Sequence, residues 1–162
     1  MADVSMGTNQ FLTFTLDQEI FGLEIDKVRE VLDYTVLTKV PQTPDFMRGV
    51  INLRGSVVPV VDMRLKFGLP MTQRTVNTCI IIVEVELNGE TTVLGALADS
   101  VREVISLNVS DIEPAPKIGT KLNTEFIKGM GRVDEKFTIL LDFDRVFSPE
   151  ELSQVIDTEQ AA

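Results

Sequence analysis

The feature that most constrains the fold of this chain is an internal repeat. Residues Gly22–Leu32 align without gaps on Gly95–Ile105, at an offset of 73 residues and with six identities in eleven positions. After an insertion of seven residues in the second copy, Phe46–Gly49 matches Phe126–Gly129 in the pattern Phe-x-basic-Gly. In both copies an aspartate follows this glycine after thirteen residues. The sequence therefore predicts two related structural units.

The apolar residues between Phe11 and Phe147 mostly recur with the strand period of two, which predicts a mainly β fold. We expect four hairpins, formed by segments 11–16 with 21–25, 50–53 with 57–61, 81–87 with 91–101, and 130–133 with 137–141. Asn88-Gly89 supplies the tight turn that the third hairpin needs. Each unit would have about five short strands, too few for a strong core, so the units should pack their apolar faces together.

Two helical segments are also expected. In Ser148–Ile156, the serine can cap the first turn, Pro149 suits the first helical position, and Glu151 completes a capping box. A shorter helical turn is predicted at Asp26–Leu32, because the apolar residues of this segment recur at helical spacing.

Composition narrows the range of functions. The net charge of −10 disfavours nucleic acids and anionic lipid surfaces as partners, and the absence of histidine removes the usual general base and zinc ligand. The single cysteine, Cys79, lies in an apolar run and is expected to be a small buried residue in a reducing compartment. The longest uncharged stretch, residues 5–16, is too short to cross a bilayer. These properties predict a cytoplasmic protein without direct membrane insertion.

No residue pattern assembles a catalytic, cofactor or metal site. Asp62 and Asp142, one from each unit, suggest a two-carboxylate protease, but the residues that follow them do not form the loop of such an enzyme. An aspartate that caps the end of a strand is the better interpretation. Gly129-Met-Gly131 lies in a predicted hairpin and does not open a helix, so it is a weak signal for phosphate binding. We therefore expect the protein not to be an enzyme.

Two features have more than one interpretation. Arg54 at a hairpin turn is either a solvated residue, or a guanidinium that binds a carboxylate within the protein or on a partner. The apolar residues of segment 25–32 are either core, or an exposed edge that binds another protein, because charged residues crowd the same segment.

The motif Phe-Met-Arg-Gly-Val-Ile-Asn-Leu-Arg-Gly-Ser-Val-Val-Pro-Val-Val-Asp at residues 46–62 and the segment Asp-Lys-Val-Arg-Glu-Val at residues 26–31 strongly resemble the CheW-like family of chemotaxis coupling proteins. The resemblance extends from about residue 11 to residue 156. It implies one domain over residues 1–162, built from two intertwined five-stranded SH3-like β barrels that share a hydrophobic junction. The expected divisions are a first subdomain at about 11–75, a second at about 76–147, and a C-terminal helix at 148–157.

The resemblance also implies a function. Members of this family are non-catalytic adaptors that join the cytoplasmic tips of methyl-accepting chemoreceptors to the regulatory domain of the histidine kinase CheA. The implied location is a membrane-associated receptor array, where other CheW-like subunits are further partners. Two alternatives remain open: an adaptor of a motility or developmental kinase pathway, and a small-ligand-binding β barrel, for which the sequence assembles no polar pocket.

By the same resemblance, individual residues acquire expected roles. Receptor contact is expected at the junction and in the motif, at Ile25, Val28, Glu30, Val31, Gly49, Asn52 and Arg54. Kinase contact is expected at the exposed end of a barrel, at Val36 and Leu37.

Overall fold

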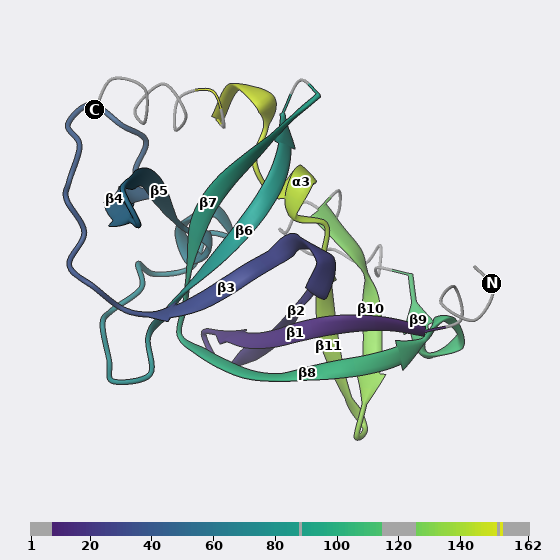
Figure 1. The fold of residues 1–162 in the computed structure, drawn as a ribbon. Coiled ribbons are helices and arrows are strands. Elements are labelled where there is room, and N and C mark those ends of the chain that lie inside the picture. Colours follow the sequence, from purple (N-terminus) through teal and green to yellow (C-terminus); the bar gives the residue numbers. More distant parts are fainter. Residues whose placement is uncertain (1–7, 88, 115–125, 152, 154–162) are drawn as a thin grey trace.

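The structure is a computed structural model that describes residues 8–87, 89–114, 126–151 and 153, and it is mainly β, as predicted (Figure 1). The described strands are β1 Thr8–Leu16, β2 Glu19–Glu24, β3 Val28–Asp33, β4 Met47–Leu53, β5 Ser56–Asp62, β6 Cys79–Leu87, β7 Glu90–Ala98, β8 Ser100–Asn108, β9 Ile112–Glu113, β10 Ile127–Val133 and β11 Lys136–Leu141. The short helices are η1 Ile25–Lys27, α2 Met63–Lys66, η2 Val109–Asp111 and α3 Phe143–Val146.

The strands form two sheets, and the sequence repeat is visible in their order. The five-stranded sheet has the order β3-β6-β7-β5-β4, and the six-stranded sheet has the order β8-β1-β2-β11-β10-β9. Apart from β9, each strand of one sheet has its repeat equivalent at the same place in the other. Each sheet takes strands from both units, because β3 joins β6 and β8 joins β1. The intertwined arrangement is confirmed, and neither residues 11–75 nor 76–147 make a sheet of their own; the subdomain boundaries stay a prediction.

The four predicted hairpins are present as antiparallel pairs β1–β2, β4–β5, β6–β7 and β10–β11. One prediction of extent was wrong, because the strand expected at 91–101 ends at Ala98. The chain leaves the five-stranded sheet there, and the residues from Ser100 onward pair with β1 in the other sheet. Three of the turns have left-handed backbone at both central residues, with φ of +51° and +72° at Asp17 and Gln18, of +51° and +89° at Arg54 and Gly55, and of +47° and +66° at Asp134 and Glu135.

The helical turn predicted at Asp26–Leu32 is wrong beyond its first residues. Only Ile25–Lys27 is helical, as a 3₁₀ turn, and the chain continues as strand β3. A bulge explains the misleading spacing, since Val28 pairs with Val83 while Glu30 already pairs with Ile82. The extra residue shifts the alternation of side chains. Positions 28 and 31 therefore face the same side of a strand although they are three residues apart.

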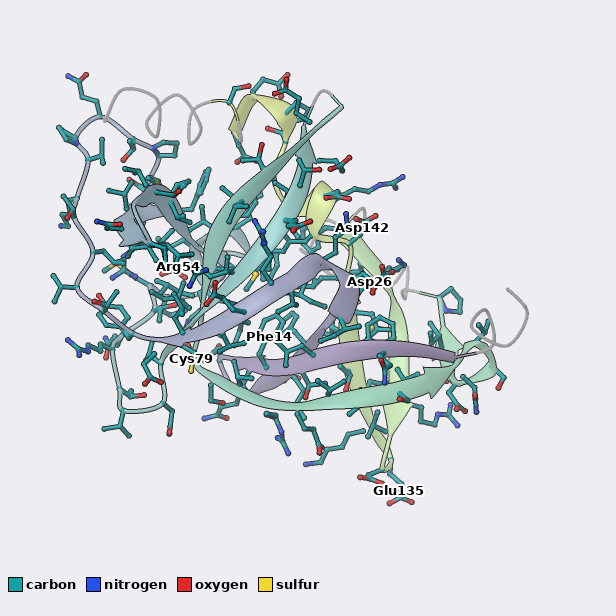
Figure 2. All side chains as sticks on the ribbon, in the orientation of Figure 1. Phe14, Asp26, Arg54, Cys79, Glu135 and Asp142 are labelled. Carbon is teal, nitrogen blue, oxygen red and sulfur yellow. The ribbon has the colours of Figure 1, made fainter. Side chains whose placement is uncertain are left out.

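The core has three parts. The largest cluster lies between the two sheets and contains Phe14, which Figure 2 labels at this junction, together with residues of both sequence units. A smaller cluster around Val60 and Ile82 belongs to the five-stranded sheet, and another around Phe11 and Leu140 belongs to the six-stranded sheet. The predicted hydrophobic junction between two small β barrels is therefore present, and it holds most of the buried apolar residues described.

Aromatic pairs show how closely the two units match across this junction. The rings of Phe67 and Phe126 are 4.8 Å apart at an interplanar angle of 31°, and the equivalent rings of Phe147 and Phe46 are 4.9 Å apart at 34°. Each pair joins a phenylalanine of one unit to a phenylalanine of the other. The junction thus contains the same aromatic contact twice, as expected for a duplicated sequence.

The beginning of the C-terminal helix follows the predicted capping box. The backbone N–H of Ser148 donates to Glu151 Oε1 at 2.8 Å, and the N–H of Glu151 donates to Ser148 Oγ at 3.1 Å. Residues 149–151 are helical, and most of the predicted helix beyond them lies outside the described residues. Among the described residues, we find no helix with the length and apolar character that crossing a membrane demands.

Candidate protein-binding surface

The residues expected to contact a receptor through η1 and β3 differ in accessibility. Ile25 and Val28 are half-buried and pack against the junction core. Val31 lies on the same face of β3 as Val28, but 39% of it is exposed. Each interpretation of this segment therefore holds for part of it. Val28 contributes to the core, whereas Val31 presents an apolar surface next to charged residues.

Glu30 and Arg54 form a two-pronged ion pair. Arg54 Nη1 donates to Glu30 Oε1 at 3.3 Å, and Nη2 donates to Oε2. The hydrogen bond from Arg54 holds the pKa of the Glu30 carboxyl below its ordinary value and raises the pKa of the guanidinium. Of the two interpretations of Arg54, the structure shows the bound guanidinium, although 70% of the side chain is still exposed.

This ion pair connects the two end strands of the five-stranded sheet. Glu30 belongs to β3 and Arg54 to the turn after β4, and these strands are the first and last in the order of the sheet. Figure 2 labels Arg54 at the β4–β5 side of the molecule. The pair therefore fixes the expected receptor strand against the motif that carries the family resemblance.

Asn52 and Gly49 have backbone roles within that motif. Asn52 Oδ1 accepts a hydrogen bond from the N–H of Gly55 at 2.8 Å, which braces the turn that carries Arg54. Gly49 is buried, its φ is +150°, and a Cβ there would lie 2.6 Å from the carbonyl oxygen of Thr38. Gly49 thus allows the segment after β3 to lie against β4, where Thr38 and Val50 exchange backbone hydrogen bonds of 2.8 and 3.0 Å.

The residues expected to contact the kinase lie in that same segment. Val36 is 78% exposed, whereas Leu37 is half-buried against the core of the five-stranded sheet. The neighbouring Tyr34 is covered by Arg74, whose guanidinium carbon lies 4.6 Å from the ring centroid. Of the two expected kinase-contact residues, Val36 is therefore the accessible one.

The two aspartates that suggested a protease serve different structural purposes. Asp62 is fully buried and accepts hydrogen bonds from the N–H of Arg64 at 3.0 Å, from both the N–H and the hydroxyl of Thr72 at 2.9 and 2.8 Å, and from Arg48 Nη1 at 2.8 Å. Asp142 makes no side-chain capping bond and pairs with Arg145 at 3.5 Å. The capping interpretation is confirmed for Asp62, and all four of its hydrogen bonds are structural.

Cys79 is less buried than the sequence predicted. It is half-buried at the start of β6, and its Sγ lies 3.2 Å from the carbonyl oxygen of Asn77. Burial raises the pKa of the thiol, which disfavours the reactive thiolate. The thiol therefore has the character of a packing residue and not of a nucleophile.

Comparison with known proteins identifies the family. The model of the CheW-like domain matches residues 10–151. The chain belongs to the CheW-like family. The chemotaxis protein CheW of Klebsiella aerogenes is 40% identical over 146 residues, which cover 90% of this chain and 86% of that protein. CheW of Rhizobium meliloti is 32% identical, with 90% and 91% covered. The crystal structure of the scaffolding protein TtCheW from Thermoanaerobacter tengcongensis superposes with a TM-score of 0.77 at 35% identity, covering 88% of this chain and 90% of that one.

Membership of this family gives the general function. CheW-like proteins are chemotaxis scaffolds of the adaptor type, and the family is non-catalytic.

Sequence reasoning missed the partners that hold the surface in place. Lys27 of η1 donates to Asp144 Oδ2 of α3 at 2.9 Å, and this hydrogen bond raises the pKa of the lysine. Asp144 also accepts from the N–H of Glu86 at 3.1 Å. These residues are far apart in the sequence, so only the folded arrangement reveals the contact.

Proposed function

We propose that this protein couples the cytoplasmic tips of methyl-accepting chemoreceptors to the regulatory domain of the histidine kinase CheA. The observation that carries the proposal is strand β3, which presents the exposed Val31 beside the Glu30–Arg54 ion pair. The similarity to the chemotaxis proteins CheW of Klebsiella aerogenes and Rhizobium meliloti supports a chemotaxis pathway over a developmental one. In this proposal the protein acts in the cytoplasm, within membrane-associated receptor arrays that include other CheW-like subunits.

The receptor and the kinase use different parts of the five-stranded barrel in this proposal. The receptor contacts β3 at Val28 and Val31, with Ile25 and the motif residues as support. The kinase contacts the segment after β3, where Val36 is exposed. Gly49 and Thr38 connect the two surfaces, since the segment with Val36 lies against the motif strand β4. One rigid framework can therefore hold both partners at the same time.

The experiment is co-sedimentation of the full chain with a receptor signalling fragment and the kinase. Val31→Glu should weaken association with the receptor by about 2 kcal/mol or more, because the carboxylate must be desolvated at the interface. Its folding stability should change little, since the side chain is partly exposed. Val28→Glu is a poorer probe, because Val28 packs against the junction core and a charge there also destabilises the fold.

The matched control is Val109→Glu, the same substitution at a 54% exposed valine of η2. This variant should co-sediment like the unmodified protein. Equal co-sedimentation of the two variants would remove β3 from the receptor contact. Loss of a cooperative thermal transition in Val31→Glu would show a core role instead. Binding of the unmodified protein to the kinase of a different pathway, with none to a chemoreceptor fragment, would favour the developmental alternative.

A further inference from the structure

A small apolar cavity at the junction lies apart from both surfaces of the proposed function. Its volume is about 110 Å³, and it is lined by Leu16, Phe21, Phe67, Leu69, Phe126 and Ile139. Its lining includes none of the residues expected to contact receptor or kinase. An apolar cavity of about 150 Å³ binds one benzene molecule in another protein, so this one has room for a single apolar side chain.

The sequence repeat allows the surroundings of this cavity to be compared with the equivalent position in the other half of the molecule. The pair Phe67–Phe126 on one side of the cavity corresponds to Phe147–Phe46 in the other half of the molecule. Phe147 is followed by the beginning of the C-terminal helix, which Lys66 ties down through hydrogen bonds of 2.6 and 2.7 Å to Glu151. Lys66 Nζ also lies 5.9 Å from the centroid of the Phe147 ring.

On the cavity side the chain continues differently. Phe67 is followed by Gly68 with a φ of +78°, and the segment from Leu69 to residue 78 contains no helix. The aromatic rings that line the cavity are largely buried, with Phe67 and Phe126 9% and 5% exposed. Among the described residues, a helix thus begins shortly after Phe147, whereas a non-helical segment follows Phe67 beside the cavity.

The charges at the border of the cavity determine which kind of partner would bind there. Asp17 and Glu19, both exposed, border the apolar lining. The guanidinium of Arg64 lies 3.6 Å from Asp17 Oδ1 and 2.9 Å from Asp99 Oδ2. Together with Glu19, these groups are three carboxylates and one guanidinium, with a net charge of −2. The beginning of this chain's own C-terminal helix is also acidic, with Glu150 and Glu151, so a second copy of that helix would be repelled.

We infer that the cavity is a docking site for an amphipathic helix of a partner protein, one that inserts a single bulky apolar side chain and places Lys or Arg residues against Asp17 and Glu19. The apolar side chain supplies most of the affinity, because it leaves water for a pocket with three phenylalanine rings. The basic residues supply orientation and partner choice at the exposed border. This site is a third surface, independent of the receptor and kinase contacts.

The test uses the full chain and a synthetic helical peptide with one leucine flanked by a lysine one turn before and one turn after it. Peptide binding is followed by NMR chemical-shift mapping, without receptor or kinase. The shifts should centre on Leu69, Phe126 and Ile139. Replacing the peptide leucine by alanine should weaken binding at least about tenfold, and replacing its lysines by glutamates should abolish it at the same concentrations.

Protein variants separate the border from the cavity. Glu19→Lys, at the first residue of β2, should weaken binding about threefold, whereas the control Glu90→Lys, at the first residue of β7, should have no effect. Leu69→Lys should prevent binding. If that variant does not fold, the alanine peptide tests the same contact from the other side. Equal affinity for the lysine and glutamate peptides, equal effects of the two Glu→Lys variants, or shifts centred on β3 would each overturn the inference. None of these outcomes bears on co-sedimentation with the receptor, so the inference and the proposed function can fail independently.

Discussion

The buried carboxylate of Asp62 offers the sharpest test of what holds the motif strands together. Asp62→Asn keeps the size of the side chain but removes its charge and replaces one acceptor oxygen by a donor. In the folded protein the two oxygens accept four hydrogen bonds, from Arg48, from Arg64 and twice from Thr72. An asparagine oxygen can retain two of these bonds, and its NH₂ group then faces two other donors.

The expected cost follows from burial. Asp62 has no exposed surface, and its partner Arg48 is 20% exposed. Removing one partner of a buried ion pair costs about 3–5 kcal/mol, because it leaves the other charge uncompensated. We expect the lower part of this range, about 3 kcal/mol, because Arg48 retains a hydrogen bond of 3.2 Å to the carbonyl oxygen of Thr72 and some contact with water. For a domain of this size, that loss corresponds to a decrease in Tm of about 6–12 °C.

The assay is urea unfolding combined with thermal unfolding, and the repeat provides a matched control. Asp142→Asn makes the same substitution at the equivalent aspartate, whose side chain is 32% exposed and makes no capping bond. We expect this control to lose less than about 1 kcal/mol. If both variants lost the same free energy of unfolding, the hydrogen-bond cluster around Asp62 would not be the source of its stability, and the reasoning would be refuted.

Two further outcomes follow from the motif and its ion pair. Gly49→Ala should lower the free energy of unfolding by about 2 kcal/mol or more in urea titration, because its φ is +150° and the new Cβ would meet the Thr38 carbonyl oxygen at 2.6 Å. Because Arg54 lowers the pKa of Glu30 in the folded protein, the pair stabilises the fold above the unfolded pKa, and this contribution is lost as pH falls through the lowered folded pKa. Glu30→Gln should therefore reduce the stability difference between about pH 7 and about pH 3, and an unchanged difference would contradict the assignment.

Local pattern was sufficient to predict the strands and hairpins, because side-chain alternation and turn chemistry act over a few residues. The pairing of β3 with β6 and of β8 with β1 was implied by the family resemblance and not by the pattern, since pairing partners such as Val28 and Val83 are far apart in the sequence. The bulge at Val28–Glu30 was predicted as a helical turn. A bulge gives valines the spacing of a helix, so periodicity alone cannot distinguish the two.

The candidate surface was predictable in its residues but not in its contacts. The motif drew attention to Arg54, and only the structure shows that its partner is Glu30, 24 positions earlier in the chain. Gly49 was predicted only as a member of the motif, whereas the structure shows that its lack of a Cβ leaves room for the backbone of Thr38. Long-range ion pairs and close backbone approaches leave no periodic signal, which is why these roles required coordinates.

The two barrels have equivalent turns, and one side chain makes them different. Arg54 and Asp134 occupy the same place in the repeat and have similar left-handed backbone, with φ of +51° and +47°. In the six-stranded sheet, Asp134 and Glu103, the equivalent of Glu30, line one cleft together with Arg102 and Lys136. Because Asp134 and Glu103 are both acidic, they cannot form the ion pair that Arg54 and Glu30 form in the other barrel. Strand β8 is instead held to Thr13 of β1, whose hydroxyl donates to the carbonyl oxygen of Glu103 at 2.7 Å and accepts from its N–H at 3.1 Å.

These two ways of holding an edge strand have different consequences for binding. The hydrogen bonds of Thr13 hold β8 at its bulge through the backbone of Glu103 and not through its side chain. The Glu30–Arg54 pair instead holds β3 through its side chain, at the surface, where a partner can contact it. A charged group on a partner that competes for Arg54 would therefore remove this side-chain contact between β3 and the β4–β5 turn. Strand β3 keeps its backbone pairing with β6, as β8 keeps its pairing with β1, so the difference between the two strands lies in the exposed side-chain contact alone.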